Sequence, residues 1–276
     1  MSFVPSFVVG DVVDNKKICE EFKCSNMGGM RRSHSKNCLV IISDHTKLLY
    51  DDIWYNDILY FTGMGKNGDQ SIDFRQNKTL AESKSNGIEV HLFEVFRSKQ
   101  YKYRGIVTLD DDPYQEIQNG EDGVARKVWI FPLKLINEKD VIEDSVIKEC
   151  SDNIEKRVKK LNIDEIRRMA LIDSEKSISM RKVVSHVYER SHNISLYVKI
   201  MSNGICELCN KKAPFNYLDG SPYLESHHVN WLSNGGKDSI NNVVALCPNC
   251  HRKMHVMNLK EDIDRLIEKI KTRKLI

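Results

Sequence analysis

The first half of the chain alternates short apolar or aromatic runs with turn residues. The apolar runs lie at residues 39–42, 58–61, 90–95 and 128–131. Segments rich in glycine and asparagine, such as residues 63–69 and 119–120, separate some of them. Several short strands between such turns are typical of a sheet or a barrel. The pattern therefore predicts a β-rich domain over residues 1–135.

Residues 136–200 have a different character. This segment contains no glycine and no proline, and its charge is dense. Apolar side chains recur at helical spacing in its second half, at Ile163, Ile166, Met169 and Ala170. We predict a helical connector here. The basic run at residues 156–160 either contacts a nucleic-acid backbone or forms a solvated helix face.

The remaining residues, 201–276, hold a module rich in cysteine and histidine. It closes with an amphipathic helix predicted over Leu259–Leu275, whose apolar face is formed by Ile263, Leu266, Ile267 and Ile270. Strands followed by helices, in three successive parts of the chain, predict an α+β fold.

Composition limits the possible classes of protein only slightly. The chain has 276 residues, of which 41% are hydrophobic, so packed domains are expected rather than disorder. No apolar run approaches the length of a membrane span. The first residues lack the pattern of a signal peptide, so a cytoplasmic location without membrane contact is predicted. The net charge of +3 is mild and does not by itself indicate a nucleic-acid partner.

Four of the eight cysteines form two Cys-x-x-Cys pairs, Cys206/Cys209 and Cys247/Cys250. Two such pairs supply the four thiolates of a zinc site that has no open position, so we predict a structural Zn²⁺. Two disulfides are the alternative, which a reducing compartment disfavours. The other cysteines lack ligand spacing and are predicted to be reduced thiols: Cys19, Cys24, Cys38 and Cys150.

Four histidines lie between and just after these pairs. His227 and His228 are adjacent in a segment that predicts a strand, so their side chains should point to opposite faces and have different roles. His251 and His255 are four residues apart. On a helix they share one face, which suits the binding of one metal ion. The alternative is that this second pair only packs against the zinc site.

Residues 201–258 resemble the HNH nuclease family, whose catalytic core is a ββα-metal motif. The resemblance rests on Leu224-Glu225-Ser226-His227-His228, on residues 242–251 and on His255. It implies that His228 is the general base and that Asn242 braces the loop carrying it. His227, His251 and His255 would hold a divalent ion, Mg²⁺ or Mn²⁺, with Co²⁺ or Ni²⁺ also compatible. Such an ion stabilises phosphoryl charge while a neutral histidine accepts a proton. The opposite assignment of His227 and His228 stays open.

Residues 28–135 resemble SRA domains, a PUA-like β-barrel fold that flips a modified cytosine out of DNA. The resemblance rests on the number and order of short segments, among them 29–33, 59–65, 77–83 and 128–133. The chain departs from the family at Tyr103-Arg104-Gly105, where the family has Tyr-Asp-Gly.

A flipped base needs stacking faces and polar groups at its Watson–Crick edge. Tyr60 and Phe61 are candidates for stacking, and Asp69 for accepting a hydrogen bond from the cytosine amino group. Arg31 and Arg32 follow two glycines and are candidates for phosphate contacts. Each has a structural alternative: strand packing for the aromatic residues, a turn for Asp69, and surface charge for the arginines.

Together these resemblances imply a type IV-like restriction endonuclease, similar to McrA-type and other SRA–HNH enzymes. Its parts would be an SRA-like recognition domain (1–135), the helical connector (136–200) and an HNH endonuclease domain (201–276). The implied substrate is double-stranded DNA with 5-methyl- or 5-hydroxymethylcytosine. Double-strand cleavage by single sites implies a homodimer. The alternatives are an HNH nuclease without modification dependence and a non-catalytic reader of modified DNA.

Overall fold

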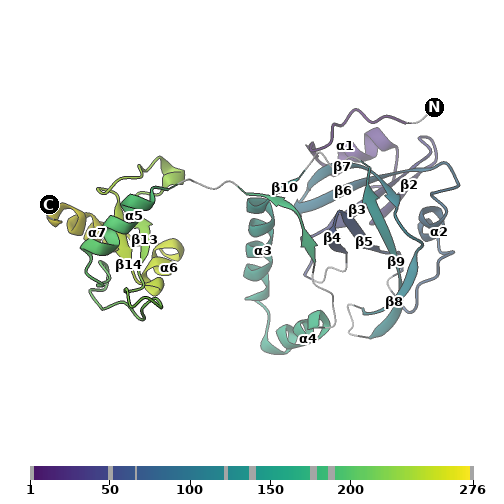
Figure 1. Ribbon diagram of the computed structural model, residues 1–276. Coiled ribbons are helices and arrows are strands. Elements are labelled where there is room, and N and C mark those ends of the chain that lie inside the picture. Colours follow the sequence, from purple (N-terminus) through teal and green to yellow (C-terminus); the bar gives the residue numbers. More distant parts are fainter. Residues whose placement is uncertain are drawn as a thin grey trace. The chain divides into compact units, whose positions relative to one another are not determined.

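The structure, a computed structural model, describes residues 3–48, 52–65, 67–120, 124–136, 141–174, 179–185 and 190–273. The chain divides into two compact units, Met1–Ser185 and His186–Ile276, and each is described by itself. The first unit includes helices α3 (Asp144–Val158) and α4 (Ile163–Ser174), whereas α5 (His192–Met201) belongs to the second (Figure 1). The predicted domain boundaries at residues 135 and 200 stay predictions.

A mixed 10-stranded sheet forms most of the first unit (Figure 1). Its strand order is β11-β4-β5-β9-β7-β6-β3-β2, with β1 paired to β7 and β8 to β9. The strands are β1 Val12–Val13, β2 Met30–Ser33, β3 Cys38–Asp44, β4 Ile53–Asn56, β5 Ile58–Thr62, β6 Glu89–Arg97, β7 Gln100–Leu109, β8 Tyr114–Asn119, β9 Ala125–Leu135 and β11 Met180–Arg181. The four predicted apolar runs lie within β3, β5, β6 and β9, which confirms them as strands. Among the described residues, β11 and β2 are the edge strands of this order.

Strand β3 is buried on both faces of the sheet. On β3, Leu39 and Ile41 pack in one hydrophobic cluster, while Val40 and Ile42 pack in another. This follows from the period of two in a strand, and a strand buried on both sides appears as a continuous apolar run. Helix α1 (Asn15–Phe22) covers the second cluster, and α2 (Gln76–Ala81) packs against the first. The α+β fold class is therefore confirmed.

A buried carboxylate ties the end of the first unit to its sheet. Glu94 on β6 is 0% exposed. Its carboxylate accepts hydrogen bonds from Trp54 Nε1 at 2.8 Å, Arg104 Nη1 at 2.9 Å and Arg181 Nη2 at 2.6 Å. Burial alone would raise the pKa of Glu94, but Arg181, His45 and Arg104 hold it well below its usual value. Arg104 occupies the position where the SRA family has aspartate, so this departure supplies a partner for Glu94.

We expect Glu94→Gln to destabilise the first unit by about 3–5 kcal/mol, because the buried Arg104 and the partly buried Arg181 lose their counter-charge. Urea unfolding followed by tryptophan fluorescence measures this. Since the folded-state pKa of Glu94 is lowered, its stabilisation is present above the unfolded-state pKa and is lost as pH falls. The variant should lack this part of the acid dependence. Glu116→Gln, on the exposed side of β8, is the control, and equal unfolding free energies for both variants would contradict the account.

The second unit is built on a β-hairpin followed by a helix. Strands β13 (Glu225–His228) and β14 (Val243–Leu246) pair antiparallel, with His227 opposite Val244. Helix α6 (Pro248–Val256) follows, and η1 (Leu232–Asn234) lies in the loop between the strands. Proline at the first position of α6 suits a helix start, because that position needs no backbone N–H.

Helix α7 (Lys260–Thr272) confirms the predicted amphipathic helix, although Leu275 lies outside the described residues. Leu266 is buried, and Ile263 and Ile270 pack against the same cluster as Leu246 and Met254. Short two-residue strands, β10 (Ile142–Glu143) and β12 (Val183–Val184), pair in the first unit and were not predicted. None of the helices in the described parts of the chain is long and apolar enough to span a membrane.

Candidate active site and metal centres

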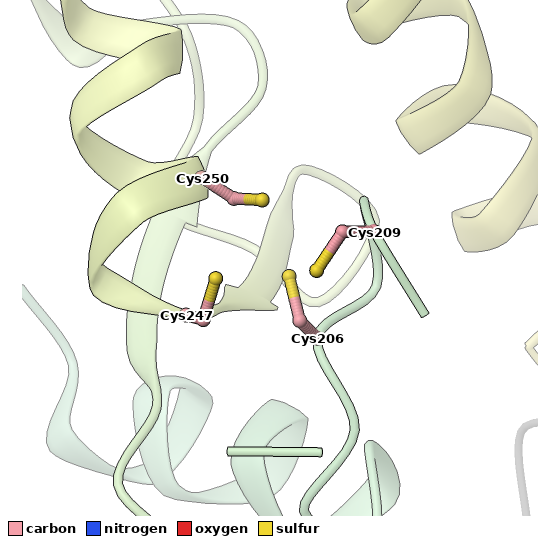
Figure 2. Close-up of side chains that lie close together, drawn as sticks. All are labelled: Cys206, Cys209, Cys247 and Cys250. Atoms are coloured by element: carbon pink, nitrogen blue, oxygen red, sulfur yellow. The ribbon is translucent and has the colours of Figure 1, made fainter. Parts of the chain in front are cut away.

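Four cysteine sulfur atoms converge in the second unit. Cys206 and Cys209 lie in the loop after α5, Cys247 directly precedes α6, and Cys250 lies on it. Figure 2 shows the four side chains pointing toward one another, and their sulfur atoms lie within 4.8 Å of each other. Tetrahedral zinc, with Zn–S bonds of about 2.3 Å, places its sulfur ligands about 3.8 Å apart. The donors therefore fit the predicted Zn²⁺, and none of the four is in a disulfide.

Three histidines form a second cluster. His251 and His255 lie one turn apart on α6, with 3.0 Å between their Nε2 atoms. His227 reaches the same point from β13, and the three ligand atoms lie within 4.8 Å of one another. His227 Nε2 is buried and has no hydrogen-bond partner in the described parts of the chain. Burial, followed by the charges of His251 and His255, lowers the pKa of His227 to about 3, so its nitrogen lone pair is available to a metal ion.

Glu225 orients the imidazole ring of His251 in this cluster. Its Oε2 contacts His251 Nδ1, which directs the other ring nitrogen of His251 toward His227 and His255. A carboxylate on the outer nitrogen of a histidine is the usual support of a metal-binding imidazole. Glu225 belongs to the predicted motif, but its role depends on the approach of α6 to β13 and was not predicted.

His228 lies apart from the three-histidine cluster. It is 7% exposed, and its Nε2 lies 2.9 Å from Asp238 Oδ1. Asp238 also accepts a hydrogen bond from the backbone N–H of Ser191, just before α5, at 2.6 Å. The two adjacent histidines therefore have different neighbours, as the alternation of a strand predicts. Asp238 was missed, because no spacing in the sequence connects a loop residue to His228.

Asn242 fixes the loop between the two strands. Its Oδ1 accepts from the backbone N–H of Asn230 at 2.8 Å, and its Nδ2 donates to the carbonyls of Asn230 and Lys237, each at 2.8 Å. These bonds close the loop directly after His228 and just before Asp238. The position is the one that a bracing role requires, and the catalytic roles of both residues stay predictions.

The three predicted base-contacting residues lie in different environments. Phe61 is 4% exposed in the hydrophobic core, while Tyr60 lies on the other face of β5 and is partly exposed. Asp69 is exposed, and its Oδ1 accepts from the backbone N–H of Lys127 at 2.8 Å. These positions favour strand packing for Phe61 and a turn role for Asp69 over contact with a base.

The two predicted phosphate-binding arginines are held within the fold. Arg31 is 4% exposed and donates to Gly28 O at 2.9 Å and to Asn15 Oδ1 at 2.6 Å. Arg32 donates to Cys38 O at 3.0 Å and to Asn37 Oδ1 at 2.8 Å. Backbone and amide acceptors occupy both guanidinium groups, which favours structural roles.

A different carboxylate has the properties expected of a base-reading group. Asp52, just before β4, accepts from Ser43 Oγ at 2.9 Å and from the backbone N–H of Thr62 at 3.0 Å. Burial raises the pKa of Asp52 to about 6, although both hydrogen bonds act in the opposite direction. A partly exposed acid with a pKa near neutrality is a candidate functional residue. Asp52 was not predicted, because no motif or glycine-rich loop marks it in the sequence as one marks Asp69.

Comparison with known proteins identifies both units. The model of the ScoMcrA-like SRA domain family matches residues 9–157, and that of the HNH endonuclease family matches residues 206–256. Because the first match covers more than half of the chain, the protein belongs to the ScoMcrA-like SRA family, with an HNH endonuclease domain following. The predicted pairing of SRA and HNH domains is confirmed.

Individual relatives cover the chain unevenly. It is 53% identical over 81 residues to the type IV methyl-directed restriction enzyme EcoKMcrA of Escherichia coli strain K12, which is 29% of either chain. The phosphorothioation-dependent restriction endonuclease ScoMcrA shares 19% identity at a TM-score of 0.41, over 96% of this chain and 63% of that one. The SRA domain of SUVH5, solved with methylated CHH DNA, shares 23% sequence identity at a TM-score of 0.40. That match covers 51% of this chain and 96% of the SUVH5 chain. The chain spans less than two thirds of EcoKMcrA and of ScoMcrA.

Proposed function

We propose that the protein is a modification-dependent DNA endonuclease. The first unit would bind double-stranded DNA with a modified cytosine, and the second would hydrolyse a phosphodiester bond nearby. One observation carries the proposal: three histidine nitrogens converge beside a separately held His228 on the hairpin and helix of an HNH domain that follows an SRA domain.

In the catalytic step, His228 would remove a proton from the attacking water. With Asp238 accepting from Nε2–H, the lone pair of His228 lies on Nδ1, and the ring is held in one orientation. His227, His251 and His255 would hold the divalent ion, which supplies charge stabilisation at the phosphate when bound. Mg²⁺ or Mn²⁺ is the proposed ion, with Co²⁺ or Ni²⁺ as alternatives, and Zn²⁺ is proposed for the cysteines.

For the reading step, we propose that Asp52 contacts a cytosine flipped from the duplex. Its carboxylate would accept a hydrogen bond from the exocyclic amino group, while Ser43 and Thr62 hold it in place. Tyr60 keeps its proposed stacking role, since its ring is partly exposed. The names of EcoKMcrA and ScoMcrA record a methyl-directed and a phosphorothioation-dependent enzyme, and the modified base is the target proposed for this chain.

We expect Asp52→Asn to weaken binding to a modified duplex about 5- to 150-fold, the effect of losing one specific base contact. With a pKa of about 6, the ionised acceptor is present above that pH, so wild-type affinity should fall as pH drops below 6. The variant should bind with little pH dependence in this range. Fluorescence anisotropy with a labelled duplex measures both effects. Asp69→Asn is the matched control, and the assignment fails if the two variants bind alike.

Cleavage of both strands would require two copies of the single metal site, so a homodimer is proposed on DNA. Sedimentation of the full chain with a modified duplex tests this, and a strict monomer that still cuts both strands would contradict it. Cleavage and binding assays with modified and unmodified duplexes distinguish the two alternative functions. A nuclease without modification dependence would cut all duplexes equally, and a non-catalytic reader would bind a modified duplex without cutting it in any divalent ion.

A further inference from the structure

The second unit carries an exposed aromatic hairpin, residues 213–223, that contributes no ligand to either proposed metal site. Phe215 is 54% exposed, Tyr217 45%, and Leu218 at the tip is fully exposed. The rings of Phe215 and Tyr223 stack with centroids 4.5 Å apart, and Tyr217 lies 4.9 Å from Tyr223. Clustered large apolar side chains on a protein surface indicate an interaction site.

This hairpin is firmly held at its base. Tyr223 N donates to Phe215 O at 2.9 Å, and Ala213 N donates to Gly204 O at 2.8 Å. Gly204 has a φ of +72°, and a Cβ there would lie 2.8 Å from Pro222, so the hairpin packs closely against the backbone next to Cys206. At the tip, Ser221 donates twice to Asp219 Oδ1, at 2.9 Å and 2.6 Å. The apolar tip is therefore presented by an ordered support.

The aromatic hairpin is continuous with the three-histidine cluster. Tyr223 Oη donates to Glu225 Oε1 at 3.1 Å, and the other oxygen of Glu225 contacts His251. Through Glu225, the base of the hairpin therefore contacts a residue of the proposed metal site. Lys211 and Lys212, both exposed at the base of the hairpin, add positive charge that complements the DNA backbone.

We propose that the aromatic hairpin is a base-stacking wedge for the DNA duplex at the cleavage site. Leu218 enters a base step beside the scissile phosphate, and Phe215 and Tyr217 stack against the exposed base face. Apolar side chains inserted between base steps unstack DNA, and aromatic rings bind bases of any sequence. This inference rests on the proposed nuclease function. It adds local distortion at the cut, separate from recognition of the modified base by the first unit.

The test compares Leu218→Ser and Phe215→Ser with Leu196→Ser, an exposed leucine on α5 in the same unit. Duplexes carry 2-aminopurine at successive positions around the mapped cut. In a His228→Ala background, which keeps the DNA uncut, the native hairpin should raise fluorescence at one step. Leu218→Ser and Phe215→Ser should abolish this signal, and Leu196→Ser should preserve it.

In chains with His228 intact, Leu218→Ser and Phe215→Ser should slow single-turnover cleavage about 5- to 150-fold, the range expected for loss of one stacked base. The proposal is overturned if both variants retain the signal and the rate, or if they change only the oligomeric state. Wild-type cleavage is scored first. Its absence rejects the nuclease function and the wedge together, whereas normal cleavage by both hairpin variants rejects the wedge alone.

Discussion

His228→Ala is expected to reduce the rate of DNA cleavage by about 10²- to 10⁴-fold, the usual contribution of a histidine base. The imidazole of His228 contacts Asp238 rather than the three-histidine cluster, so its removal leaves every proposed metal ligand in place. Single-turnover cleavage measures the rate, and metal content by atomic emission should equal that of the wild type. Binding to modified DNA should also be unchanged, because Asp52 lies in the other unit.

His192→Ala is the control for this experiment, since His192 is an exposed histidine on α5 of the same unit. It should cleave at the wild-type rate. The opposite assignment of the adjacent histidines has its own signature. If His228→Ala loses the catalytic ion while His227→Ala keeps it, the general base and the metal ligand are exchanged.

Cys206→Ser is expected to cause the largest loss of stability in the chain. Structural zinc contributes about 10–16 kcal/mol in small zinc domains, comparable to or larger than the net stability of most domains. The Cys206 side chain is 0% exposed and packs in the hydrophobic cluster of the second unit. We expect one zinc ion fewer per chain and loss of the cooperative unfolding of this unit.

The first unit should survive that substitution, because its sheet and its three hydrophobic clusters contain none of the four cysteines. Anisotropy with a modified duplex should therefore still report binding, while cleavage is lost. Cys19→Ser, which changes a thiol outside the cluster, is the control. Retention of the full zinc content by Cys206→Ser would contradict the assignment of the site.

Part of the clustering of the proposed metal ligands was predictable from the sequence because it is local. Cys247, Cys250, His251 and His255 lie within one short stretch, and helix periodicity alone places both histidines on one face of α6. The strand containing His227 and His228 likewise fixes their opposite directions. The supports of the site, Glu225 and Asp238, depend on how α6 and a loop pack against that strand, which spacing does not encode.

Base-contacting residues were harder to predict, because a pocket collects side chains from several strands. Phe61 and Tyr60 are adjacent in sequence, yet the alternation of β5 buries the first and exposes the second. Burial raises the pKa of Asp52, and its two hydrogen-bond donors, Ser43 and Thr62, lie on two different strands, β3 and β5. The role of Arg104, which replaces the family's aspartate, depends on its hydrogen bond to the buried Glu94.

The most direct test of the proposed function is cleavage of matched duplexes that differ only in one base, cytosine, 5-methylcytosine or 5-hydroxymethylcytosine, in Mg²⁺ or Mn²⁺. We predict cleavage of a duplex with modified cytosine, no cleavage of the unmodified duplex, and loss of cleavage in His228→Ala. Equal cleavage of all duplexes, or cleavage that persists in His228→Ala, would contradict the account.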